Sequence, residues 1–336
     1  MNLTQINFQW RWTLKKDTNH DENDVLEGLQ PPGNLKSLAI ENFAGDHFPT
    51  WVMKMSINID GRWTPLDNII KIKLYRCKSC LYLPMLECLP LLEDLVLEGM
   101  DSLTCLSSNS MKPLSPSLRS LQLNDMISLE NWMDASTPNS STMLSPVLKS
   151  LLILDCPKII NLDECHPHPL VSLTIRNCIS LVSIKSIQGL TSLQDLKISD
   201  CWRLLEIPYL KNYEHHHLKT LEISGHMTSI PCEIFDCFSF LSTLKLGRFP
   251  EELHSFPSLK GIEKLRNHLQ SLTLCGWEHW ESIPEEIKHL TSLTRLTIHT
   301  FGIRELPLWL INMSHVQVKI VQNAIPISTQ PIHQHY

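Results

Sequence analysis

The chain has 336 residues and a net charge of −6 at pH 7. This acidic balance argues against a general nucleic-acid-binding protein, which needs a basic stripe to release counterions from phosphates. No apolar run approaches the roughly 20 residues of a membrane-spanning helix, and the first residues, MNLTQINFQWRW, lack the apolar core of a signal peptide. The composition therefore predicts a cytoplasmic protein with no membrane span and no nucleic-acid partner.

A short apolar frame recurs along the chain. It reads Leu-x-x-Leu-x-Leu/Ile and is followed by Cys or Phe, as in LTSLQDLKISDC (residues 190–201). Because side chains alternate between the two faces of a strand, Leu196 and Ile198 are expected to point into a core and Lys197 away from it. One such unit cannot bury its own apolar face, so neighbouring units must stack on one another.

In chain order the frame predicts thirteen short strands. A weak copy at Leu3, Ile6 and Phe8 comes first, and a weak copy at Val318 and Ile320 comes last. In the later part of the chain the central residue advances by 22 to 30 residues per copy. The central residues of the clear copies are Leu38, Ile72, Leu95, Leu121, Leu151, Leu173, Leu196, Leu221, Leu244, Leu272 and Leu296.

The stacked copies predict an α/β solenoid, a leucine-rich-repeat horseshoe with a concave parallel β-sheet and an irregular or short-helical convex side. PEEIKHL (residues 284–290) predicts a brief helical turn, with Pro at its first position and acids in its first turn. We expect residues 1–33 to form an incomplete first repeat and its connecting segment. Residues 34–321 are expected to form a solenoid of about twelve repeats, and residues 322–336 a disordered tail.

Cysteines and histidines occur in patterns that suggest metal binding at first sight. CKSC (residues 77–80) has zinc-type spacing, but no second ligand pair follows, and Cys77 already occupies a repeat position. DECHPH (residues 163–168) and HHH (residues 215–217) fall between repeats, where solvated loop histidines are the favoured interpretation. The cysteines that share the repeat position are expected to be buried free thiols: Cys77, Cys156, Cys178 and Cys201. The sequence therefore predicts no metal site.

Motifs for nucleotide binding and hydrolysis are missing from the sequence. No Gly precedes Lys, and no Gly-x-Gly or Gly-x-Ser-x-Gly occurs. Nothing in the spacing of Ser, His and Asp selects a triad, so we expect no cofactor and no enzymatic activity. The Ser-rich stretches at residues 107–117 and 134–146 are expected to be extended loops, with recognition loops as the alternative.

The exposed positions of the strands predict a binding surface. They mix charged, aromatic and aliphatic residues, whereas the core positions hardly vary within the chain. Leu152 and Leu154 place two apolar side chains on one exposed strand face. Tyr75, Arg76 and Arg176 are residue types favoured at interface hot spots. The candidate protein-binding residues are Lys73, Tyr75, Arg76, Leu152, Leu154, Arg176, Lys197, Glu222, Lys245 and His299.

Three passages resemble one known family. DVLEGLQPPGNLKSLAIENFAGDHFPTW (residues 24–51) resembles the repeat region of plant intracellular disease-resistance receptors of the nucleotide-binding, leucine-rich-repeat (NBS-LRR) class, coiled-coil type. IKLYRCKSCLYLPMLECLPLLEDLVLEGM (residues 72–100) and SLRSLQLNDMISLENW (residues 117–132) are similar to its following repeats. The late LTSL and IPEEI copies resemble its C-terminal repeats.

The resemblance implies a recognition module of plant innate immunity. Such a module senses pathogen effectors, directly or through a guarded host protein. In the family it also regulates a nucleotide-binding switch domain, which these 336 residues do not contain. The chain is therefore expected to bind proteins but not to hydrolyse ATP by itself.

Three other interpretations remain open. The first is the substrate-receptor part of an F-box ubiquitin ligase, although the first 33 residues show no F-box helix bundle. The second is the ectodomain of a cell-surface receptor, which by resemblance would be richer in Gly than this chain with its 11. An enzyme is the third, and it would need a catalytic Ser or His that no motif identifies.

Overall fold

The computed structural model describes residues 3–11, 19–57, 61, 64–107, 113–133, 145–162, 169–184, 190–204, 217–225 and 227–322. DECHPH, most of HHH, large parts of both Ser-rich stretches and all but the first residue of the predicted tail lie outside these ranges. The chain forms two compact units, residues 1–227 (unit 1) and residues 228–336 (unit 2). The boundaries that the sequence suggests at residues 33 and 321 stay predictions.

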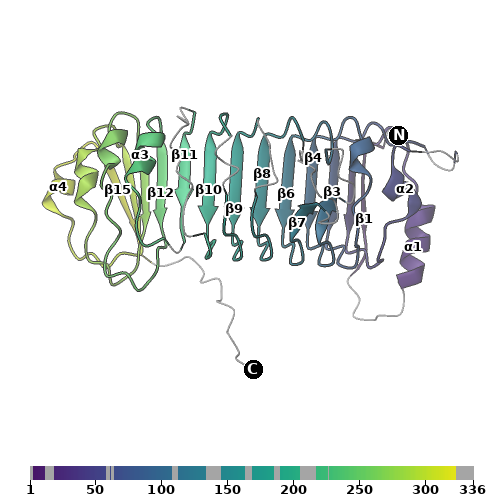
Figure 1. The fold of residues 1–336 in the computed structure, drawn as a ribbon, viewed down its shortest axis with the longest axis horizontal. Helices are drawn as coiled ribbons and strands as arrows, with labels where there is room; N and C mark the ends of the chain where they lie inside the picture. Colours follow the sequence, from purple (N-terminus) through teal and green to yellow (C-terminus); the bar gives the residue numbers. More distant parts are fainter. Residues whose placement is uncertain are drawn as a thin grey trace, which may run out of the picture. The chain divides into compact units, whose positions relative to one another are not determined.

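Unit 1 is built on parallel strands that lie side by side and point the same way (Figure 1). The return segments, which carry the chain from one strand to the next, hold helices α1 (Asn19–Gly28) and α2 (Thr50–Lys54), the 3₁₀ helix η1 (Leu86–Cys88) and a small second sheet of β5 (Cys105–Ser107) and β7 (Asn131–Met133). In order across the main sheet, the strands are β1 (Gln5–Gln9), β2 (Ser37–Glu41), β3 (Lys71–Tyr75), β4 (Asp94–Glu98), β6 (Ser120–Asn124), β8 (Ser150–Leu154), β9 (Ser172–Arg176), β10 (Asp195–Ser199) and β11 (Thr220–Ile223).

Unit 2 repeats the same plan with four parallel strands, β12 (Thr243–Gly247), β13 (Ser271–Cys275), β14 (Arg295–His299) and β15 (Gln317–Val321). Its return segments contain α3 (Glu233–Cys237), η3 (Ile262–Leu265), η4 (Glu285–His289) and α4 (Leu308–Ile311). The helical turn predicted in PEEIKHL is confirmed as η4, with Pro284 at its N-cap and not inside it.

The register of the strands aligns the predicted core residues of neighbouring repeats. Leu196 pairs with Leu173 on one side and Leu221 on the other, and its side chain is 1% exposed. Since the same register holds for the other pairs within each unit, the apolar columns run without interruption from strand to strand. All thirteen predicted strands are present. The predicted class, an α/β solenoid of leucine-rich repeats with a parallel sheet and short-helical return segments, is confirmed.

A left-handed residue ends most of the strands. These residues have φ between 50° and 58°, which Asn and Asp tolerate better than other side chains. Each turn keeps its backbone paired: the Asn177 N–H, for example, donates to the carbonyl of Ser199 on the next strand at 3.0 Å. The non-glycine residues in this conformation are Asn42, Arg76, Asp125, Asp155, Asn177, Asp200, Arg248 and Thr300. Five of these eight are Asn or Asp, and the exceptions are Arg76, Arg248 and Thr300.

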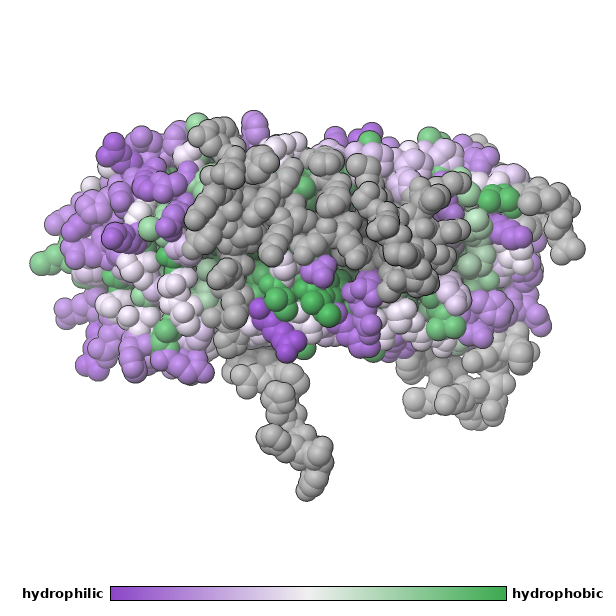
Figure 2. Space-filling model, in the orientation of Figure 1, coloured by the Kyte–Doolittle hydropathy of each residue, from purple (hydrophilic) through white to green (hydrophobic). Residues whose placement is uncertain are grey.

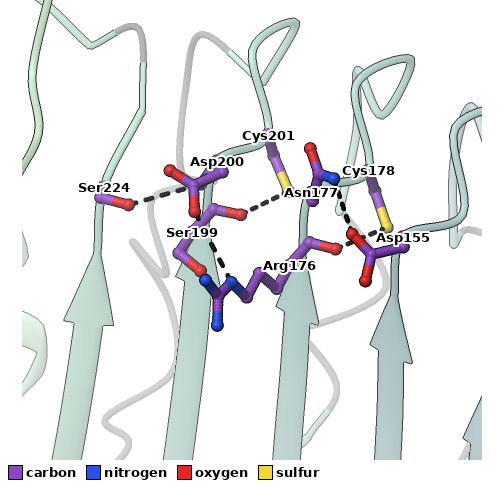
Figure 3. Close-up of polar contacts among 8 residues, drawn as sticks. All are labelled: Asp155, Arg176, Asn177, Cys178, Ser199, Asp200, Cys201 and Ser224. Carbon is purple, nitrogen blue, oxygen red and sulfur yellow. Dashed lines mark hydrogen bonds and ion pairs between the residues drawn. The ribbon is translucent and has the colours of Figure 1, made fainter. Parts of the chain in front are cut away.

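The repeat-position cysteines come directly after these turns and donate hydrogen bonds to carbonyls at the ends of the strands (Figure 3). The Cys178 thiol donates to the carbonyl of Arg176 at 3.5 Å, and the Cys201 thiol donates to that of Ser199 at 3.4 Å. The hydrogen bond with the Cys156 thiol, together with burial, raises the pKa of Cys178 to about 12. These cysteines are therefore small core residues that satisfy a carbonyl two positions back.

The CKSC cysteines also donate hydrogen bonds to backbone carbonyls. The Cys77 thiol donates to the carbonyl of Tyr75 at 3.6 Å, and the Cys80 thiol donates to that of Gly45 at 3.2 Å. Burial raises the pKa of Cys77 to about 12. Within the described residues, no group of three or more His, Cys, Asp and Glu side chains could hold a metal ion.

Helix α1 is hydrogen-bonded to helix α2, in the return segment that follows β2. The Trp51 indole N–H donates to the carbonyl of Leu26 at 2.7 Å, and the Thr50 N–H donates to the Glu27 carboxylate at 2.9 Å. The side chains of Leu26 and Trp51 are both fully buried. The passages VLEGLQP and FPTW are therefore two halves of one packing unit.

Replacing Leu196 by Ala should lower the free energy of unfolding by about 2–5 kcal/mol, because the cavity lies between two neighbouring repeats. Lys197→Ala is the matched control, since its side chain is exposed on the same strand, and it should change stability by no more than about 0.5 kcal/mol. Chemical denaturation of the full chain measures both. Equal losses in the two variants would contradict the assigned strand register.

The Cys178 thiol should resist alkylation in the folded protein, because thiolate is the reactive form and little of it exists at pH 8. Cys232, which is only partly buried, serves as the internal control. Mass spectrometry after iodoacetamide treatment should find Cys232 modified first and Cys178 modified only after denaturation. Equal rates at the two cysteines would show that the Cys178 turn opens readily.

Candidate protein-binding surface

One face of each sheet is open, and we name it the strand face. It is formed by the first, third and fifth residues of each five-residue strand, which alternate with the buried second and fourth residues, as in β3. In unit 1 the strand face of β1 to β4 contains a hollow of about 580 Å³. The hollow is lined by Gln5, Ile6, Asn7, Gln9, Ser37, Ala39, Glu41, Asn42, Lys73, Tyr75, Arg76 and Glu98.

Tyr75 is the aromatic residue of this hollow. It pairs in register with Glu41 on β2 and with Glu98 on β4, so a carboxylate lies on each side of it. The Lys73 ammonium lies 5.7 Å from the centre of the Tyr75 ring, within reach of a cation–π interaction. The Asn7 amide donates to the Glu41 carboxylate at 3.1 Å. The hollow therefore combines an aromatic ring with both signs of charge.

Arg76 enters the hollow from the turn after β3. Its φ of 51° is a left-handed conformation that Arg seldom adopts. Its side chain passes close to Gly99, where an added β-carbon would lie 3.2 Å from the Arg76 Cγ. Gly99 itself has a φ of 62°. The same left-handed conformation recurs after other strands, and in this turn it places an arginine at the hollow.

The other candidates of unit 1 form two further groups. Leu152 and Leu154 are half-buried on the strand face of β8, and Leu154 pairs with Arg176 on β9. The Arg176 guanidinium is turned toward Asp200, with its Nε 3.7 Å from the carboxylate (Figure 3). Lys197 and Glu222 pair across β10 and β11. The structure thus brings the candidates together locally but not into one site.

In unit 2, Lys245 on β12 and His299 on β14 lie on the same strand face. The pKa of His299 is lowered, first by its partial burial and then by the positive charges of Lys245, Lys319 and Arg248. The two candidates therefore lie within a larger group of basic residues.

Sequence reasoning missed several residues of these surfaces. Glu41, Glu98 and Asn7 line the hollow, while Arg248 and Lys319 act on His299. The repeat frame could have identified some of them. Arg248 occupies the position directly after a strand, and Asn7 and Lys319 lie on the strands of the weak first and last copies. Val96 is the opposite case: it occupies a strand-face position of β4 but is only 6% exposed.

The return segments of unit 1 carry exposed apolar side chains. Ile160 is 55% exposed and Val182 is 52% exposed, and the Val182 N–H donates to the carbonyl of Ile160 at 2.8 Å. Figure 2 shows a small group of hydrophobic atoms next to the grey ones. Ile160 and Val182 are aliphatic, whereas the hollow is lined by an aromatic ring and by charged side chains.

Parallel strands in register, continuous Leu and Ile columns and short-helical return segments define a leucine-rich-repeat protein. A chain from the octameric complex of Latrophilin 3 (Lec, Olf), Unc5D (Ig, Ig2, TSP1) and FLRT2 (LRR) shares this fold, with a TM-score of 0.52 and 15% identity over 87% of this chain and 85% of that one. Among the described helices, none is long and apolar enough to cross a membrane.

Sequence comparison shows which proteins the chain resembles. Residues 1–100 match the model of the R13L1/DRL21 leucine-rich repeats. The chain is 27% identical over 286 residues to disease resistance RPP13-like protein 1 of Arabidopsis thaliana, which covers 80% of this chain and 23% of that protein. It is 29% identical over 214 residues to disease resistance protein RGA1 of Solanum bulbocastanum, covering 63% and 20%. The resemblance to the leucine-rich-repeat region of plant NBS-LRR disease-resistance proteins is confirmed, and the chain spans about a quarter or less of the length of these relatives.

Removing a neighbouring cation should raise the pKa of His299 toward its ordinary value of 6.5. Lys319→Gln or Arg248→Gln should do so, whereas Lys260→Gln, an exposed lysine of a return segment, should not; NMR titration of the imidazole resolves the difference. Because folding lowers this pKa, the folded chain binds the proton less readily than the unfolded chain. The free energy of unfolding should therefore be unaffected by His299 above pH 6.5. It should decrease as the pH falls below 6.5, because the unfolded chain then binds the proton more readily. An unchanged pKa in both variants would show that the cations do not act on His299.

Proposed function

We propose that this chain is a protein-recognition module of plant innate immunity. In this proposal it senses pathogen effectors, directly or through a guarded host protein, and regulates a nucleotide-binding switch domain. The proposal rests first on the hollow of unit 1, where Lys73, Tyr75 and Arg76 lie together on a rigid sheet. Its relatives RPP13-like protein 1 and RGA1 are disease-resistance proteins, which supports the immune role over an F-box receptor.

The chemistry of the hollow favours a protein ligand. Tyr and Arg are the residue types that most often dominate protein interfaces, because they bury large surfaces and still offer polar groups. Glu41 and Glu98 beside Tyr75 would select basic groups of a partner, while Lys73 and Arg76 would select acidic ones. We expect a rigid scaffold to hold these groups in place, so that little entropy is lost on binding.

We infer that the chain acts by binding and without catalysis, cofactor or metal. Its proposed place of action is the cytoplasm, where both partner classes would meet it. Imaging a fluorescent fusion in leaf cells checks the location, and an exclusively extracellular signal would contradict it.

Tyr75→Ala should weaken partner binding by at least about tenfold, or about 1.4 kcal/mol, because it removes the central ring of the hollow. Tyr82→Ala is the matched control, since Tyr82 is 57% exposed on a return segment. Affinity capture from infected leaves supplies the partner, which is then purified and titrated against each variant by calorimetry.

The titration decides between two outcomes. Wild type and Tyr82→Ala should bind alike while Tyr75→Ala and Arg76→Ala bind weakly. Equal affinity of all the variants, or the lack of any captured protein that binds directly, would contradict the proposal.

A further inference from the structure

The strand face of unit 2 carries positive charge only. Its charged members are Lys245, Arg295, Lys319 and the turn residue Arg248, with His299 among them. No Asp or Glu occupies a strand or turn position of β12 to β15, all of which the structure describes. The strand face of unit 1 differs, because Glu41, Glu98 and Glu222 interrupt its cations.

The acidic residues of unit 2 lie on its return segments instead. They neutralise cations there: Lys264 forms an ion pair with Asp236, and Lys288 forms one with Glu285 at 2.6 Å. The strand face and the return segments of the unit therefore differ in charge.

The strand register aligns two of these cations in one row of the sheet. Lys245, Thr273, Thr297 and Lys319 form a single row across β12 to β15. At about 4.8 Å per strand, the two lysines are roughly 14 Å apart, with two threonine hydroxyls between them. After its partial burial, the positive charges of Lys245, Lys319 and Arg248 contribute to the lowered pKa of His299 on this face.

We propose that the strand face of unit 2 binds an acidic segment of a protein partner. The carboxylates of a short run of Asp and Glu would meet Arg248, Arg295 and Lys319, and the threonines would donate hydrogen bonds to them. An extended segment of about five residues is long enough to follow the row. A nucleic acid fits less well, because the whole chain carries a charge of −6 that repels a long polyanion. This inference rests on the proposed function for the presence of a protein partner.

A labelled peptide of about eight residues rich in Asp and Glu serves as the probe for the full chain. Its Asn and Gln analogue and a DNA oligonucleotide of equal charge are the comparison ligands. Fluorescence anisotropy should show binding of the acidic peptide but not of the neutral one, with an affinity that falls steeply as salt increases. Saturation with the peptide should also raise the pKa of His299, since carboxylates would offset the neighbouring cations.

Charge reversal locates the binding site. Arg248→Glu and Lys319→Glu should each weaken peptide binding by about tenfold or more. Lys260→Glu makes the same change in charge on a return segment of the same unit and should alter binding by less than about twofold. Thermal melting checks that each variant is folded. Arg248→Gln and Lys319→Gln provide milder versions if a reversal unfolds the unit.

Several results would overturn the inference. These are equal binding of the acidic and neutral peptides, equal effects of Lys319→Glu and Lys260→Glu, and tighter binding of DNA than of peptide. Self-association that Lys319→Glu abolishes would also overturn it, by making a second copy of the chain the occupant. Loss of the Tyr75-dependent partner with peptide binding intact would instead contradict the proposed function alone.

Discussion

Each strand depends on its neighbours to cover its apolar side. Leu196 and Ile198 are buried because Leu173, Ile175, Leu221 and Ile223 stand beside them in register. This nearest-neighbour burial explains why the core positions vary so little, since any polar residue there would be left without water or a partner. The strand face is under no such constraint, so its residues are free to serve recognition.

The turn that follows each strand links the core to the surface. A left-handed residue reverses the chain, and the next side chain, Cys178 for example, enters the core and donates to the carbonyl behind it. Asn, Asp or Gly fits this conformation with little strain. Arg76 and Arg248 occupy it nonetheless, and each projects a guanidinium at the edge of a candidate surface. A strained position held by a rigid core is one way in which a repeat scaffold can fix the direction of a long side chain.

The two units use the same backbone for different electrostatics. The hollow of unit 1 mixes Lys73 and Arg76 with Glu41 and Glu98, whereas the strand face of unit 2 gathers cations and leaves its acids on the return segments. Mixed charge gives specificity by matching and by repelling, while a field of one sign also speeds encounter with an oppositely charged segment. The packing of the repeats is the same in both cases, so these differences arise from the strand-face residues alone.

The repeat frame by itself determined the thirteen strands, their core columns and the leucine-rich-repeat class, because burial on one side of a strand imposes a period of two that a single sequence displays. It also placed Lys73, Tyr75 and Arg76 on the open face. Only the tertiary structure decided which of the candidates lie together. Glu41 and Glu98 lie beside Tyr75 on the two neighbouring strands, Val96 becomes covered by its neighbours, and Lys319 comes to act on His299. Such neighbours depend on the register between strands, and a shift of one residue would turn every side chain to the other face.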